Sequence, residues 1–257
     1  MKFFDALLPI GRTNGAMFNA PATIKQLLRY MDRYYISEAL VVHTLSRDSG
    51  PDIGNMEILS CKHDRIKRVW AFDPCCVKVD SAAEFLNRAL KNDIMAILIN
   101  PTMMGVRVDR TSRIDDLAGL LEKRRIPLIL SYSKAAGLPS DIIIWYELTD
   151  FCKKFPKLPV IACELSTLSN RPMLEALAQA KNLKVMLSSI WQAQMLDTIV
   201  ERFGHQRVVF SMGAPLMDPG DFQMVVNYAD MSLKAKEAVA SGNMMNILEE
   251  ADYEIQR

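Results

Sequence analysis

The stretch FGHQRVVFSMGAPLMDPG, residues 203–220, carries the pattern that decides the fold. Gly204 follows an apolar helical stretch and marks its end, because glycine is the usual residue just beyond a helix C-terminus. The β-branched and aromatic run Val208-Val209-Phe210 predicts a short strand, and two prolines mark the loop after it. Helix, short apolar strand and loop together indicate a chain in which helices and strands alternate.

The same alternation extends along all 257 residues. Each short apolar run is followed by a stretch with apolar residues at helical spacing, and Ser81 and Glu84 have the spacing of a capping box. The expected strands cover residues 3–8, 39–43, 69–72, 95–99, 127–130, 160–163, 183–187 and 208–210. This pattern predicts the α/β fold class and a single (β/α)8 TIM barrel over residues 1–257. An open doubly wound sheet is the alternative, but no G-x-G-x-x-G follows a strand.

The composition narrows the classes of function. With 31 basic and 30 acidic residues the net charge is +1, which argues against a nucleic-acid surface. No apolar run reaches the roughly 18 residues of a membrane helix. No signal peptide is expected, because Asp5 interrupts the first apolar run and Pro9 ends it. The five cysteines are therefore expected to be reduced thiols in a cytoplasmic protein.

Several short motifs resemble the amidohydrolase-related family, which are (β/α)8 metal hydrolases. The text of that family's eighth strand is close to FG-x-x-R-V-L-F-G-S-D-Y-P-x-x-D-P, and the matching residues here are Arg207, Phe210, Pro215, Asp218 and Pro219. The family's His-Pro-Asp-Arg is similar to residues 62–65, and its closing G-N-x-x-R-L-L is similar to residues 242–248. The resemblance implies a barrel whose chemistry lies at the C-terminal ends of the strands.

The resemblance also implies that the metal site has been lost. The family's metal-binding positions fall here on Leu7, Pro9, Ser131, Glu164 and Gly213. Leucine, proline and glycine side chains have no electron pair to offer a metal. The chain has three histidines, of which only His43 is expected at the mouth of the barrel, whereas a catalytic zinc site commonly takes three protein ligands. We therefore expect no metal and no other cofactor.

The tentative catalytic residues are Glu164 and His43. Strand alternation is expected to turn Ala162 and Glu164 toward the barrel axis and Cys163 toward the helices. A buried carboxylate needs a partner, so Glu164 either pairs with a basic residue such as Arg12 or contacts a ligand. His43 is either a satisfied core histidine or an acid–base group.

Further contacts are expected from the loops that follow the strands. Residues 46–55 form the expected second loop, and the fourth carries arginines that would favour an anionic ligand if one of them turned inward. Methionines beside the mouth would form an adaptable apolar wall. The predicted ligand-binding residues are Arg12, Arg47, Asp48, Asn100, Arg107, Ser131, Tyr132, Ser188 and Met212.

Two classes of function follow from these residues. The first is a barrel that has lost metal hydrolysis and binds a small polar or anionic metabolite, as a binding protein or pseudoenzyme. The alternative is a metal-independent hydrolase of the lactonase type, with Glu164 as acid or base on a sugar acid or carboxylate. A metal hydrolase with a relocated site also stays open. A homo-oligomer is compatible with each of them.

Overall fold

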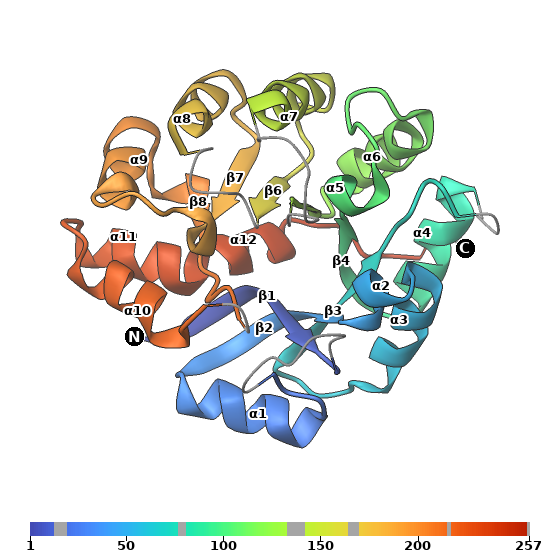
Figure 1. Cartoon of the computed structure of the whole chain (residues 1–257), viewed down its shortest axis with the longest axis horizontal. Coiled ribbons are helices and arrows are strands. Elements are labelled where there is room, and N and C mark those ends of the chain that lie inside the picture. Colours follow the sequence, from blue (N-terminus) through green and yellow to red (C-terminus); the bar gives the residue numbers. More distant parts are fainter. Residues whose placement is uncertain (13–19, 77–80, 133–141, 164–169, 215–216, 256–257) are drawn as a thin grey trace.

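A computed structural model describes residues 1–12, 20–76, 81–132, 142–163, 170–214 and 217–255. Its eight parallel strands form one sheet in the order of the sequence, ringed by helices (Figure 1). The strands are β1 (Phe3–Ile10), β2 (Ile36–His43), β3 (Ile66–Ala71), β4 (Ile94–Ile99), β5 (Leu128–Ser131), β6 (Val160–Cys163), β7 (Leu183–Met186) and β8 (Val208–Val209). The Ala6 N–H donates to the Phe210 carbonyl at 2.9 Å, which brings the first strand to the end of the last. The predicted (β/α)8 barrel is confirmed.

Local sequence signals explain where several helices begin. The helices are α1 (Ile24–Arg33), α2 (Leu45–Asp48), α3 (Pro51–Glu57), α4 (Ala82–Lys91), α5 (Pro101–Met104), α6 (Ser112–Arg124), α7 (Ile142–Lys154), α8 (Asn170–Gln179), α9 (Met195–Phe203), α10 (Pro219–Tyr228), α11 (Leu233–Glu237) and α12 (Asn243–Glu249). The predicted capping box is present at α4, where the Ser81 hydroxyl accepts from the Glu84 N–H at 3.2 Å. In the described part of the chain no helix is both long and apolar enough for a membrane span.

Strand side chains alternate between two apolar layers. One layer joins strand residues such as Leu40, Leu98 and Ile129 to side chains of α12, and it fills the inside of the barrel. The other joins the intervening strand residues to the surrounding helices. Helix α12 presents Ile247 and Leu248 to the first layer and covers the end of the barrel where the strands begin. The mouth of the barrel is the other end, where the strands finish.

The segment after β2 differs from the predicted loop, because residues 45–57 contain α2 and α3. The two helices pack closely: a Cβ added at Gly54 would lie 2.2 Å from the Ser46 backbone nitrogen. The Asn55 amide holds α3 against the end of β3. It donates to the Ala71 carbonyl and accepts from the Ala71 N–H, both at 2.8 Å. Glycine is needed at Gly54 because a side chain there has no space.

Arg207, one of the residues that match the family motif, has a structural role. Its Nε donates to the Leu183 carbonyl at 2.8 Å. Its Nη2 donates to the carbonyls of Leu177 and Ala180 at 3.0 and 2.5 Å, at the end of α8. Carbonyls at a helix C-terminus lack partners within the helix, so this buried guanidinium satisfies them and ties α8 to β7 and β8.

Candidate functional site

Four polar residues follow the strands on the face that lines the inside of the barrel. Two residues after the interior side chains Ala71, Leu98, Ile129 and Met186 come Asp73, Asn100, Ser131 and Ser188. Alternation with a period of two puts Ser131, the last residue of β5, on this interior face, and Asn100 directly follows β4. Asp73 and Ser188 come two residues after the ends of β3 and β7, so they lie at the same end of the barrel. We call all four residues the mouth ring. Three of them were predicted as ligand contacts. Asp73 was missed, although the same alternation, extended past β3, identifies it.

Asn100 is the most informative member of the mouth ring. It follows β4, next to Ser131 in the register, because Ile99 pairs with Leu130. The residue is only 3% exposed. Its side-chain amide caps no helix and has no hydrogen-bond partner within the described part of the chain. A side-chain amide without a partner in the protein can exchange hydrogen bonds with a ligand.

The other two positions of the ring are half-buried. The Asp73 carboxylate accepts from the Cys75 N–H at 2.8 Å, which fixes a turn just after β3. Ser188 lies beside Gly213, since a Cβ added at Gly213 would be 3.0 Å from the Ser188 Cβ. Apart from Ser131, the ring therefore offers an amide, one hydroxyl and one carboxylate, which can exchange hydrogen bonds with a polar molecule.

His43, at the end of β2, is directed away from the mouth ring. It shares a strand face with Val41, which packs against the helices. Its ring lies against Gly11, where an added Cβ would be 2.9 Å from Nε2, and its Nδ1 accepts from the Leu45 N–H at 3.3 Å. Burial lowers the pKa of His43, against the opposing effect of Glu57, so the imidazole is neutral at neutral pH.

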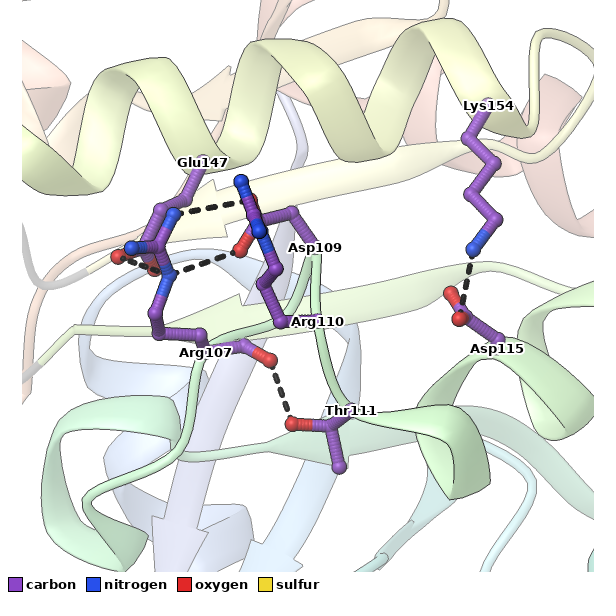
Figure 2. Close-up of polar contacts among 7 residues, drawn as sticks. All are labelled: Arg107, Asp109, Arg110, Thr111, Asp115, Glu147 and Lys154. Carbon is purple, nitrogen blue, oxygen red and sulfur yellow. Dashed lines mark hydrogen bonds and ion pairs between the residues drawn. The ribbon is translucent and has the colours of Figure 1, made fainter.

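Arg107 is engaged by two carboxylates, neither of which belongs to the mouth ring (Figure 2). Its guanidinium bonds Asp109 at 2.9 and 3.1 Å and pairs with Glu147 of α7 at 3.1 Å. Glu147 is nearly buried, and desolvation raises its pKa although Arg107 acts in the opposite sense. This ion-pair cluster joins the connection before α6 to α7. The Arg107 guanidinium is therefore paired with carboxylates of the protein and does not bind an anion from solution.

Tyr132 and Met212 belong to the layer between the strands and the helices. The Tyr132 hydroxyl is buried without a hydrogen-bond partner among the described residues, and burial raises its pKa. Met212 is fully buried, so it forms no part of an exposed wall. Of the remaining predicted contacts, Arg12 is exposed, and Arg47 pairs with its neighbour Asp48 at 3.0 Å.

Asp5 forms a buried polar contact where β1 meets the end of β8. Its carboxyl accepts from the backbone N–H groups of Leu7 at 3.0 Å and Met212 at 3.2 Å. The side chain is fully buried. Desolvation raises its pKa to about 7, although these two N–H groups and the Ser211 hydroxyl act in the opposite direction. The contact links the two strands through a group that takes up a proton near neutral pH.

The predicted orientation of the side chains of β6 is wrong. Cys163 lies in the layer inside the barrel, and Ala162 lies in the layer that faces the helices. Glu164, the predicted acid or base, is outside the described residues, so its role stays a prediction. Throughout the described ranges no group of three or more His, Cys, Asp or Glu side chains could hold a metal ion.

Two of the positions that the resemblance assigns to metal ligands, Leu7 and Gly213, have side chains without a donor atom. Leu7 lies in the apolar layer inside the barrel. Gly213 has a φ of +66°, and a Cβ there would be 2.8 Å from the Met217 Cγ. An aspartate at this position would need both a strained backbone and a displaced methionine. We therefore derive no step through a metal.

The fold was compared with solved structures, whereas no protein-family model and no curated protein sequence matches the chain. A TIM-barrel protein from Bordetella bronchiseptica aligns with TM-score 0.73 and 15% identity, covering 97% of this chain and 99% of the other. 5-Carboxyvanillate decarboxylase from Sphingomonas paucimobilis gives 0.73 and 13%, covering 96% and 99%. A Pseudomonas putida protein described as a 2-pyrone-4,6-dicarboxylic acid hydrolase gives 0.68 and 11%, covering 97% and 98%. The chain thus shares the (β/α)8 fold of these proteins, which is the fold that the sequence motifs predicted.

Proposed function

We propose that the protein binds a small polar metabolite bearing a carboxylate at the mouth of the barrel, without metal-assisted hydrolysis. The observation that carries this proposal is Asn100, a residue only 3% exposed whose side-chain amide has no partner among the described residues. A carboxylate accepts hydrogen bonds from amide and hydroxyl donors, which Asn100 and Ser188 would supply. The Asp73 carboxylate would favour a hydroxyl group elsewhere on the same ligand.

The absence of metal-assisted chemistry is supported by the residues at the family's metal positions. Leu7 and Pro9 supply no donor atom, and Gly213 lies against Met217 and Ser188. A ligand would then be held by neutral donors, each contributing about 0.5–1.5 kcal/mol net, more where it meets a charged group. Such a site binds a polar ligand and does not generate a metal-activated nucleophile.

The comparisons support a ligand that bears a carboxylate. Two of the similar structures bear the names of a carboxyvanillate decarboxylase and a pyrone dicarboxylic acid hydrolase. Both names specify compounds that bear carboxylates. At 11–13% identity the likeness is one of fold, so the ligand class rests on the mouth ring and the names together.

The test is a thermal-shift screen of aromatic and aliphatic carboxylates on chelator-treated protein, followed by titration calorimetry of each hit. We expect one compound to bind with a stoichiometry near one. Asn100→Ala should weaken it by roughly 5- to 150-fold, the equivalent of about 1–3 kcal/mol for a lost buried hydrogen bond. Asn227→Ala removes the same amide from an exposed position on α10 and should leave the affinity unchanged. Equal affinity in the Asn100 variant would refute the assignment.

A further inference from the structure

A pocket lies at the opposite end of the barrel from the mouth ring. It has a volume of about 420 Å³ and is lined by segments that precede β5, β6, β7 and β8, together with α12. That volume lies within the roughly 300–1,000 Å³ typical of small-molecule sites. We call it the N-face pocket. Active sites of (β/α)8 enzymes lie at the other face, so a ligand here would occupy a separate site.

Positive charge is concentrated in this pocket. Its lining includes the basic residues Arg125, Lys157, Lys181 and Lys184, and the single acidic residue Glu250. Glu250 is already paired with Arg125. The whole chain has a net charge of only +1, so the surplus is a local feature of this face. A concave surface with one sign of charge raises the local concentration of oppositely charged molecules.

Lys184 is the least solvated of the four cations. It lies half-buried in β7, and its Nζ donates to the Gln206 carbonyl at 3.2 Å. No carboxylate lies within ion-pair distance of it among the described residues. Burial lowers its pKa to about 8, and the charges of Arg207 and Arg125 add to this effect, whereas Glu250 opposes it. An ammonium group has three donors, so two remain for a ligand.

The walls of the N-face pocket are held by contacts that do not involve those cations. The Asn243 amide donates to the carbonyls of His205 and Val208 at 2.7 and 2.8 Å. The Asn182 amide donates to the carbonyls of Phe155 and Leu158 at 2.8 and 2.9 Å. These amides fix the backbone, so the pocket exists before a ligand arrives and little ordering is needed on binding.

We propose that the N-face pocket binds a small dianion, a phosphate-bearing or dicarboxylate metabolite, through Lys184 and Lys181. The two amine groups supply charge-assisted hydrogen bonds, and Arg125 and Lys157 add to the positive field. The volume suits one small molecule. Because this site is distinct from the mouth, the proposal is independent of the function proposed above.

The test uses the full chain with inorganic phosphate and with succinate, each measured by titration calorimetry against sodium chloride of matched ionic strength. At least one of the two should bind saturably, with a stoichiometry near one. Lys184→Met keeps the bulk of the side chain without its charge and should weaken binding at least tenfold. Lys181→Ala changes an exposed residue, so its effect can be measured even if the Lys184 variant folds poorly. Lys234→Met, an exposed residue of α11, is the matched control.

The pH dependence gives a second readout. A bound dianion stabilises the charged ammonium, so binding should weaken as the pH rises above the pKa of Lys184, which is about 8. Phosphate binding that is lost in Lys184→Met but kept in Lys234→Met would support a ligand with a phosphate group. The same result with succinate would support a dicarboxylate ligand. Binding of neither probe beyond the chloride control, or equal binding by the Lys184, Lys181 and Lys234 variants, would overturn the proposal.

Discussion

Replacing Asp5 with asparagine should change the pH dependence of stability more than any other single substitution at the seam between β1 and β8. The buried carboxyl has a pKa of about 7 in the folded protein, compared with 3.8 for the free side chain. Between these values the folded protein holds a proton that the unfolded chain has lost. The stability contributed by Asp5 is therefore fully present below pH 3.8 and is lost as the pH rises through 7.

The magnitude follows from the same two pKa values. Stability should fall by about 1.4 kcal/mol per pH unit across the window, which gives about 3 kcal/mol between about pH 5 and about pH 8.5. The asparagine variant would have no such slope. Its amide offers one acceptor oxygen, whereas the carboxyl accepts from both Leu7 and Met212, so near pH 5 the variant should be less stable by about 1–3 kcal/mol.

The assay is reversible urea unfolding of the wild type and Asp5→Asn at a series of pH values. Other titrating groups, such as His43 and Lys184, are common to both proteins, so they cancel in the difference between the two curves. We expect the advantage of the wild type to shrink steadily from about pH 5 upward and to vanish or reverse above about pH 7. A difference that stays constant with pH would refute the reasoning about Asp5.

Further predictions concern packing and the buried arginine. Arg207→Met should destabilise the fold by about 3–5 kcal/mol, because three carbonyls lose a charged donor, whereas Arg110→Met at an exposed ion pair should cost less than about 1 kcal/mol in urea unfolding. An equal effect of the two would contradict the role of Arg207. Gly54→Ala should cost more than about 2 kcal/mol, since its Cβ would meet the Ser46 backbone at 2.2 Å. Gly119→Ala adds a Cβ on α6 whose nearest neighbour lies at 4.0 Å, so this substitution should raise the stability of the fold by about 0.5–1 kcal/mol. Thermal unfolding that ranks the two alanine variants otherwise would show the packing argument to be wrong.

The fold could be predicted from the sequence because each unit of the barrel carries local signals. Apolar runs, helical spacing and the capping box at Ser81 are all read within a few residues. The family motif could also be read, and Arg207 and Asn243 show why. Both side chains bind backbone carbonyls at the N-terminal face, and those contacts depend on the type of residue. These motif residues therefore stabilise the barrel.

The candidate site was predicted only in part, for reasons that differ between residues. Strand β6 is buried on both faces, so its four residues show no alternation that would reveal which side faces the axis. Arg107 pairs with Glu147 of α7, a contact forty residues away that no local pattern indicates. Asn100 and Ser131 could be placed at the ends of β4 and β5 because a polar residue at the end of an apolar strand stands out in the sequence, and their role as ligand contacts stays a prediction.

The most direct test of the central claim compares carboxylate binding with and without a divalent metal. Protein as purified is analysed for zinc, manganese and iron, and the affinity for the best carboxylate ligand is then measured by calorimetry after chelation and after adding manganese or zinc back. The account predicts substoichiometric metal, affinities that agree within about twofold, and no turnover in either state. About one tightly held ion per chain whose removal abolishes binding, or turnover that appears only with the metal, would contradict it.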